Sequence, residues 1–521
     1  MVNPMFLIVL FLGSAFISAL LDKMHRGVSL GVFYGTLVAA LGIPIWQVWQ
    51  LLINPAAGSI VYSAGFAAPL SISLSFGLSE SILLSLINFM GVLGGMFLFK
   101  RFKEFGAQPI VLFMMILLGA NGLVLTRDIF NSFVFLEILS IASYALIGVQ
   151  QNKNSLAAGI KYMLAGGIAS TIYLIGIVFA YRYTGTLNID TWISMGSSGG
   201  NAYKVAVFLV GIGLLLELKP FPANGWALDL YQSADSGVGA MIASINTGAT
   251  LFLFYKLMPL FSPDLLEIFA ASGLVSFVFA NLIAIRQTNA KRLLGYSSTA
   301  QTGLIIFALG SLQLLGLPPS GVLVIAFGLF VTNFFAKSGL LWLSGMVKKD
   351  NLKDWSFQET GMLIIFGIFL IALMGFPPFP SFFGKWNLVS LFAATKAWMW
   401  LGGLLLGSFL EAVYLFRWLS FAAKGKAPAT IKQPVSRLVP VLLGAVVLVG
   451  SSLLISQYYP GTHTMTMLPV IGLMIFGLIE FFPGKLKGFI AIGALSAWAW
   501  FILFPNLPLM GQVFTVVLVG G

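Results

Sequence analysis

Six acidic and basic residues lie within long apolar stretches of this sequence, where a charged side chain is costly. They are Glu137, Glu217, Lys219, Lys337, Lys385 and Glu411. Ionisable residues at membrane depth face the interior of a helix bundle and mark ion pathways or proton relays. Lysine suits such a relay because burial readily changes its protonation state. The set mixes acidic and basic groups along the chain, which indicates a series of titratable groups for cations rather than a pocket for a solute.

Most of these residues also have a structural interpretation. Glu137 can serve as an ion-pair partner or a helix cap, and Glu217 can simply neutralise Lys219. Because a carboxylate near an ammonium favours both charged forms, Glu217 and Lys219 can pair with each other or with Glu137. Lys385 stands beside Trp386 and can be an interfacial anchor. These readings compete with a role in ion movement.

Lys337 is harder to explain as an anchor. It lies ten residues before the inner end of its apolar run, or about 15 Å along a helix, which is too far for its stem to reach the interface comfortably. By contrast, Lys161 and Glu80 lie near the ends of their runs, where ordinary anchoring is favoured. Lys256 ends its run and is expected to extend its ammonium group to the membrane surface.

Two proline-rich segments interrupt the apolar runs beside these charges. Residues 216–226 contain Glu217, Lys219 and Pro-Phe-Pro, and residues 375–386 contain Pro-Pro-Phe-Pro and Lys385. A helix loses backbone hydrogen bonds at proline, and inside a bilayer the freed groups must find other partners. Two broken, charged helices in the two halves of a membrane protein predict an ion path near the bilayer midplane. Polar residues that can hold water along it are Asn246, Thr247, Ser298, Gln301, Thr302 and Asn333.

The composition is that of an integral, multi-pass membrane protein. Of the 521 residues, 59% are hydrophobic and only 8% are charged, against roughly a quarter charged in soluble domains. The chain has no cysteine and two histidines, so cysteine-ligated iron–sulfur clusters are excluded and haem or zinc sites are not expected. We therefore expect no cofactor and no metal site, and any redox chemistry must belong to another subunit.

Sixteen apolar runs have the ~17–25 residues that span a bilayer, and the last three are the least clearly defined. They are 4–21, 28–53, 80–100, 109–126, 129–149, 156–182, 203–222, 236–259, 264–285, 294–315, 321–347, 360–385, 398–420, 438–457, 464–482 and 488–506. The segment 4–21 lacks a preceding basic region and is interpreted as the first membrane helix rather than a signal peptide. Residues 70–76 alternate apolar and polar side chains, which predicts a strand of a short hairpin on the outer face.

The distribution of basic residues predicts that the N-terminus faces outward. With that orientation, nineteen lysines and arginines lie in inner loops and far fewer lie in outer loops or at outer helix ends, in line with the positive-inside rule. The outer residues include Arg127, Arg182, Lys204 and Lys256. This asymmetry explains most of the net charge of +12, so the positive charge does not indicate nucleic-acid binding.

Several motifs resemble those of the antiporter-like ion-translocating membrane subunits of respiratory complex I, Mrp-type Na⁺/H⁺ antiporters and membrane-bound hydrogenases. The resemblance covers about residues 60–420. It is carried by these segments: 135–137, 158–162, 183–187, 222–226 with Asp229, 287–298, 335–337 and 375–385. The run Lys-Arg-Leu-Leu-Gly-Tyr-Ser-Ser at 291–298 and the Pro-Pro…Gly-Lys break are specific when they occur together.

The resemblance implies an all-α fold with about 14–16 transmembrane helices and broken helices 7 and 12. It divides the chain into helices 1–3 with the outer hairpin (1–108), a first inverted five-helix repeat (109–259), a second inverted repeat (264–421) and C-terminal helices (422–521). Glu137 falls on the family's helix-5 glutamate, Lys337 on its central lysine and Lys385 on its helix-12 lysine or glutamate.

This sequence departs from the family pattern at several positions. The family's helix-7 lysine position is occupied by Glu217, with Lys219 displaced by two residues, and the helix-8 lysine position falls near Gly248. Histidines often found along the axis are replaced by Gln301 and Asn333. The placement of Glu217 and Glu411 is more similar to hydrogenase-type and related archaeal complexes.

We expect an ion-translocating subunit of a multisubunit membrane oxidoreductase, complex I-like or hydrogenase-like, without redox chemistry of its own. Its expected partners are other membrane subunits, peripheral redox subunits, the lipid of the inner or cytoplasmic membrane, and H⁺ or Na⁺. The alternative is a subunit of an Mrp-type Na⁺/H⁺ antiporter without a redox partner. A stand-alone solute transporter and a purely structural subunit are further alternatives.

Overall fold

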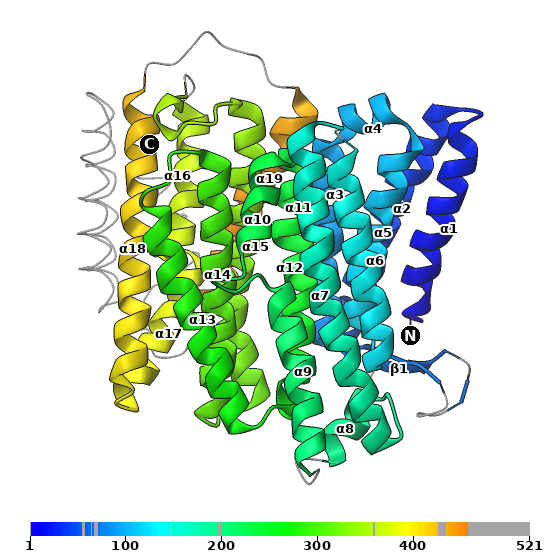
Figure 1. Ribbon diagram of the computed structural model, residues 1–521. Coiled ribbons are helices and arrows are strands. Elements are labelled where there is room, and N and C mark those ends of the chain that lie inside the picture. The colour runs from blue at the N-terminus through cyan, green and yellow to red at the C-terminus, as the bar shows by residue number, and fades with distance from the viewer. Residues whose placement is uncertain are drawn as a thin grey trace.

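The protein is a bundle of membrane-length helices standing side by side (Figure 1). The computed structural model describes residues 2–456 apart from 55–57, 64, 67–70, 150, 196–199, 358–359 and 426–433. Within these ranges, twelve helices are long and apolar enough to cross a membrane, which confirms the expected all-α membrane fold. The predicted runs at 464–482 and 488–506 lie outside the described residues.

Eleven of these helices are continuous, and the twelfth is composite. They are α1 (Met5–Asp22), α2 (Arg26–Ile53), α3 (Leu78–Phe97), α5 (Ala107–Leu125), α6 (Ile129–Gly148), α7 (Lys153–Thr184), α13 (Pro263–Ala284), α14 (Ala290–Leu314), α15 (Pro319–Val347), α18 (Trp398–Lys424), α19 (Val435–Ser456) and the composite helix from Ser236 to Leu260. Shorter helices are α4 (Phe99–Phe105), α8 (Ile189–Met195) and the 3₁₀ turn Leu352–Asp354.

The two proline-rich segments break their helices as predicted. The first break separates α9 (Asn201–Glu217) from α10 (Gly225–Ser233), and the second separates α16 (Thr360–Met374) from α17 (Pro380–Ala394). Proline cannot continue the backbone hydrogen-bond ladder. At each break one residue also has positive φ, Lys219 at 50° and Gly375 at 79°, so the chain turns out of helical geometry there.

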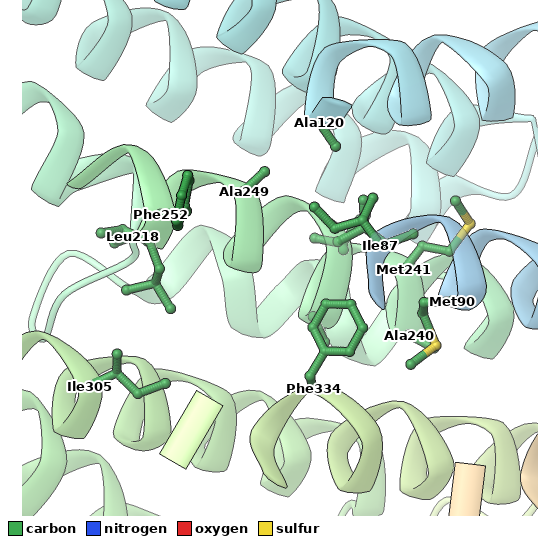
Figure 2. Close-up of a cluster of buried hydrophobic side chains, with 14 of the residues drawn as sticks. Ile87, Met90, Ala120, Leu218, Ala240, Met241, Ala249, Phe252, Ile305 and Phe334 are labelled. Carbon is green, nitrogen blue, oxygen red and sulfur yellow. The ribbon is translucent and has the colours of Figure 1, made fainter. Parts of the chain in front are cut away.

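The composite helix runs through the middle of the protein. It comprises α11 (Ser236–Met241), a π-helical turn (Ile242–Asn246), α12 (Thr247–Leu257) and a 3₁₀ turn (Met258–Leu260), where the sequence predicted one regular helix. Its membrane-length window is buried throughout. Apolar side chains of its neighbours surround it in Figure 2, among them Ile87 of α3, Ala120 of α5 and Phe334 of α15. This packing holds the polar residues of the composite helix at fixed positions inside the bundle.

The predicted β-hairpin is present. Strands β1 (Ser59–Tyr62) and β2 (Ser73–Phe76) pair antiparallel, with Ser59 opposite Phe76. A bridge between Leu74 and Thr126 joins the hairpin to the end of α5. The hairpin and α8 lie at one end of the bundle and α4 lies at the other (Figure 1).

The last described helix, α19, packs mainly against helices that are remote from it in the sequence. It lies against α3 and α15, whereas α18 stands at the far edge of the bundle (Figure 1). The helix therefore closes the bundle between segments that are far apart in the sequence.

Candidate ion-conducting chain

Lys219 lies in the first break and is almost completely buried, with 3% of its surface exposed. Its Nζ donates to Tyr231 Oη at 2.8 Å and to Thr247 Oγ1 at 2.9 Å. The expected pairing with Glu217 or Glu137 is not formed. Because α9 ends at Glu217 and Lys219 adopts positive φ, the two side chains leave the backbone on different sides of the break.

Tyr231 connects this lysine to α14. The residue belongs to α10, is buried, and its hydroxyl lies 3.1 Å from Ser298 Oγ. Tyr231 is not among the residues predicted from the sequence, because nothing in its local sequence distinguishes it from the other tyrosines. Its importance follows only from the way α10 packs against α14.

Lys337 lies on α15 and is completely buried. Its Nζ donates to Ser297 Oγ at 2.5 Å. Ser297 immediately precedes Ser298 on α14, so consecutive residues of one helix contact the Lys219–Tyr231 pair and Lys337. Lys337 also lies within electrostatic range of both Lys219 and Glu411.

Lys385 and Glu411 form a buried ion pair at the second break. Lys385 Nζ donates to Glu411 Oε2 at 2.9 Å, and Gln301 Nε2 donates to Glu411 Oε1 at 2.6 Å. Lys385 also donates to the carbonyl of Met374 at 3.0 Å, and Gln301 to that of Leu373 at 3.2 Å. The last carbonyls of a helix have no partner within the helix, so the break is stabilised by the same side chains that surround the carboxylate.

One helix, α14, links these contacts. Ser297 and Gln301 are four residues apart and lie on the same face of the helix, whereas Ser298 points about 100° away from Ser297 around the axis. They contact Lys337, Tyr231 and Glu411 respectively. Four of the six predicted site residues, Lys219, Lys337, Lys385 and Glu411, are therefore arranged around one segment of α14, residues 297–301.

Glu137 and Glu217 lie apart from this arrangement. Both side chains are half-buried, on α6 and at the end of α9, and their charges interact. Oε1 of Glu217 has no hydrogen-bond partner among the described residues. Tyr162 lies close to Glu217 and stacks on Trp226. The structure thus brings the two carboxylates together but places neither in an ion pair with a lysine of the described chain.

The expectation for Lys256 was wrong. Its side chain is 5% exposed, and Nζ donates to the carbonyls of Leu123, Val124 and Thr126 at 2.6–3.0 Å. A cation at a helix C-terminus satisfies the unpaired carbonyls and the negative end of the helix dipole. The ammonium group therefore turns inward to the end of α5 rather than outward to the membrane surface.

Glu80 and Lys161 also have defined surroundings. Glu80 is buried, at 7% exposure, and accepts a hydrogen bond from Ser79. Lys161 pairs with Asp229 of α10 at 2.5 Å, and Asp229 also accepts from Arg292 of α14 at 3.1 Å. The ion pairs of Asp229 tie α10, which carries Tyr231, to its two neighbours.

The position of the absent helix-8 lysine, Gly248, opens on an apolar cavity of about 630 Å³. The cavity lies between α3, α12, α14, α15 and α19, and its walls include Phe252 and Phe330. A Cβ atom at Gly248 would lie 3.0 Å from the Phe330 ring. Most of its lining side chains are apolar, and none of the six candidate site residues lines it. Within the described ranges, no group of three or more His, Cys, Asp or Glu side chains could hold a metal ion.

Comparisons with known proteins identify the family of this chain. A family model described as NADH:quinone oxidoreductase/Mrp antiporter, transmembrane, matches residues 126–411. The NADH-quinone oxidoreductase subunit N of Desulforudis audaxviator (strain MP104C) is 30% identical over 440 residues, which cover 78% of this chain and 82% of that protein.

Solved structures share the fold. A chain of the membrane-bound sulfane sulfur reductase, an archaeal respiratory membrane complex, superimposes with a TM-score of 0.79 at 26% identity, covering 88% of this chain and 95% of that chain. A chain of the Mrp complex from Dietzia sp. DQ12-45-1b gives a TM-score of 0.76 at 18% identity, covering 87% and 96%. The latter likeness concerns the fold alone. This chain belongs to the family of transmembrane subunits shared by NADH:quinone oxidoreductases and Mrp antiporters.

Proposed function

We propose that this chain is the ion-translocating membrane subunit of a multisubunit oxidoreductase complex. The proposal is supported by its likeness to subunit N of an NADH-quinone oxidoreductase and to a subunit of a respiratory reductase complex. In such a complex, electron transfer takes place in peripheral redox subunits, and this chain moves a proton or a sodium ion across the cell membrane. Its N-terminus faces outward, and residues 109–259 and 264–421 form two inverted repeats.

The observation that carries the proposal is the arrangement of three buried lysines along one helix. Lys219, Lys337 and Lys385 are each at most 7% exposed, and each is bonded to α14 directly or through one further side chain. Burying unpaired ammonium groups costs several kcal/mol each, and a purely structural core would not retain Lys219 and Lys337 without carboxylate partners. Such groups mark an ion pathway.

Electrostatic coupling between the buried ionisable groups gives a mechanism for ion movement. A charge on Lys219 disfavours a charge on Lys337, whereas the carboxylate of Glu411 favours it. A redox-driven change near Glu137 and Glu217 would alter the charge state of Lys219, and the change would pass through Lys337 to Lys385 and Glu411. Moving one charge across 100 mV requires about 2.3 kcal/mol, which a shift of about two units in a buried group's protonation equilibrium supplies.

Replacement of Lys337 tests the proposal. Lys337→Ala in the intact complex is expected to abolish redox-driven uptake of H⁺ and Na⁺ into inverted membrane vesicles while the complex still assembles. Lys204→Ala is the matched control, because Lys204 is an exposed lysine in the first turn of α9. Pumping by Lys337→Ala at the wild-type rate would contradict the proposal.

The alternative of an Mrp-type antiporter without a redox partner is decided by purification. Iron–sulfur, nickel or flavin subunits that co-purify with the chain support the oxidoreductase assignment. A complete complex without any redox cofactor that exchanges Na⁺ for H⁺ would replace it with the antiporter.

A further inference from the structure

Two buried hydrogen-bond clusters of the proposed ion pathway approach each other at consecutive residues of α14. The first cluster contains Lys219 and Thr247, and the second contains Lys337 and Ser297. We propose that the hydroxyl of Tyr231 relays a proton between these clusters and that the neighbouring serine pair, Ser297 and Ser298, gates the transfer. The inference rests on the proposed function and assigns the step that joins the two halves of the pathway.

Tyr231 is the only bonded route from Lys219 toward α14 among the described residues. Lys219 Nζ has two side-chain acceptors, Tyr231 Oη at 2.8 Å and Thr247 Oγ1 at 2.9 Å. The Thr247 hydroxyl donates to the carbonyl of Ile242 at 3.1 Å, so a proton passed to it leads back into the π-helical turn. The Tyr231 hydroxyl leads instead to Ser298 Oγ at 3.1 Å.

The hydrogen-bond directions suit a relay. A charged lysine ammonium can only donate, so Tyr231 Oη accepts from charged Lys219 and its own proton is free to point at Ser298 Oγ. All three side chains are at most 3% exposed, so bulk water does not compete with these bonds. The ring of Tyr231 is also held in place, because the Lys219 ammonium lies 5.2 Å from its centroid and Asp229, two residues earlier in α10, forms two ion pairs.

The connection from Tyr231 to Lys337, which we call the joint, is not continuously hydrogen-bonded. Ser298 contacts Tyr231 and Ser297 contacts Lys337, but no hydrogen bond joins the two serine hydroxyls in the described part of the chain. Consecutive helical side chains point about 100° apart. A proton therefore crosses only when one serine rotates about χ1 or the Lys337 side chain swings from Ser297 to Ser298. This makes the joint a gate.

The transfer conserves protons and charge. The N–H bond of the Lys219 ammonium breaks and a new O–H bond forms at Tyr231 Oη, while the original Tyr231 O–H proton passes to Ser298 Oγ. Once the side chain of a neutral Lys337 has swung from Ser297 to Ser298, the Ser298 proton passes to its amine in the same event, so each hydroxyl ends with one proton. Lys219 becomes neutral and Lys337 becomes charged. Because like charges repel, a proton on one of these lysines disfavours a proton on the other.

The same geometry disfavours passage of a sodium ion at this joint. Before and after the transfer one of the two flanking lysines is charged, and that ammonium group would repel a metal cation. Two serine hydroxyls and one phenol also fall short of the oxygen shell that hard cations require. The side chains at the joint can accept and donate protons, but they do not form a coordination shell for a metal cation.

The test compares two buried tyrosines in the intact complex. Tyr231→Phe is expected to reduce redox-driven proton pumping by about 100-fold, the usual contribution of a positioned acid–base group. Tyr173→Phe is the matched control. Tyr173 is also completely buried, and its hydroxyl lies 2.8 Å from Ser132 Oγ, away from the series of ionisable groups around α14. Near-wild-type pumping by Tyr231→Phe, or equal losses in both variants, overturns the relay.

A second measurement distinguishes a relay from a packing role. Difluorotyrosine at position 231 keeps the ring and hydroxyl but ionises more readily, so the pH dependence of pumping is expected to shift, whereas the same substitution at position 173 leaves it unchanged. An unchanged profile at position 231 contradicts the relay. If Lys337→Ala abolishes pumping while Tyr231→Phe does not, only the relay fails; if both variants pump normally, the proposed function fails.

Discussion

Lys385 Nζ lies 2.9 Å from Glu411 Oε2, and this contact joins α17 to α18 in the interior of the bundle. The other carboxylate oxygen of Glu411 accepts from Gln301. Lys385 also donates to the Met374 carbonyl, which has no partner within its own helix. The ion pair therefore both ends the series of ionisable groups along α14 and holds the second helix break in shape.

Removing one partner of this pair is expected to be more harmful than removing both. Glu411→Leu or Lys385→Met alone leaves a buried charge unpaired, which costs about 3–5 kcal/mol. The double variant leaves no buried charge and is expected to recover most of that loss. Thermal unfolding of the four proteins in a double-mutant cycle measures the coupling. Additive losses would contradict direct pairing, and none of the three variants is expected to pump.

Gly375 is expected to be required for the position of Lys385. A Cβ atom at this residue would lie 2.7 Å from Lys385 Cδ, and its φ of 79° is unfavourable for other residues. Gly375→Ala should therefore displace the lysine from Glu411 and lower pumping. Gly185→Ala is the control, because Gly185 has a φ of 67° but open space around it. Equal effects of the two variants on pumping would show that backbone strain alone is responsible.

Lys256 is expected to stabilise the protein without taking part in ion movement. Lys256→Met leaves three carbonyls at the end of α5 without their donor, and buried unsatisfied groups cost about 1–3 kcal/mol each. The unfolding temperature should fall, while pumping per assembled complex remains near the wild-type value. Lys204→Met, at an exposed position, should change neither quantity. An unchanged unfolding temperature in Lys256→Met would contradict the capping role.

Asp229 is expected to influence pumping through the position of α10. Its ion pairs with Lys161 and Arg292 are partly exposed, so Asp229→Asn should cost no more than about 1 kcal/mol of stability. Pumping should nevertheless fall, because α10 carries Tyr231 two residues further on. Asp190→Asn serves as the control. Asp190 lies on α8, and the substitution breaks its partly exposed ion pair with Arg127, away from the ionisable groups around α14. Wild-type pumping by Asp229→Asn would show that other contacts hold α10.

The breaks in two helices could be predicted from the sequence for a local reason. Pro220 and Pro222, like Pro377 and Pro378, remove backbone donors wherever they occur, so the end of α9 and the gap before α17 do not depend on distant packing. The β2 strand follows from alternation over a few residues. Burial of Lys337 follows equally from its distance to the end of a long apolar run.

The partners of the charged side chains could not be predicted in this way. Glu217 and Lys219 are two residues apart, yet the positive φ at Lys219 directs its ammonium to Tyr231 instead of to the carboxylate. Lys256 stands at the end of an apolar run like any interfacial lysine, but α5 ends beside it and supplies three carbonyls. These outcomes depend on how helices approach and rotate against each other.

The sequence by itself determined that the chain crosses a membrane many times, breaks two of its helices and buries ionisable groups, because hydropathy and proline act locally. Only the tertiary structure decided that α14 presents Ser297, Ser298 and Gln301 to three different ionisable clusters. It also decided that α19 closes the bundle against α3 and α15. Contacts between helices remote in sequence are set by packing of their whole surfaces, and no short stretch of residues contains that information.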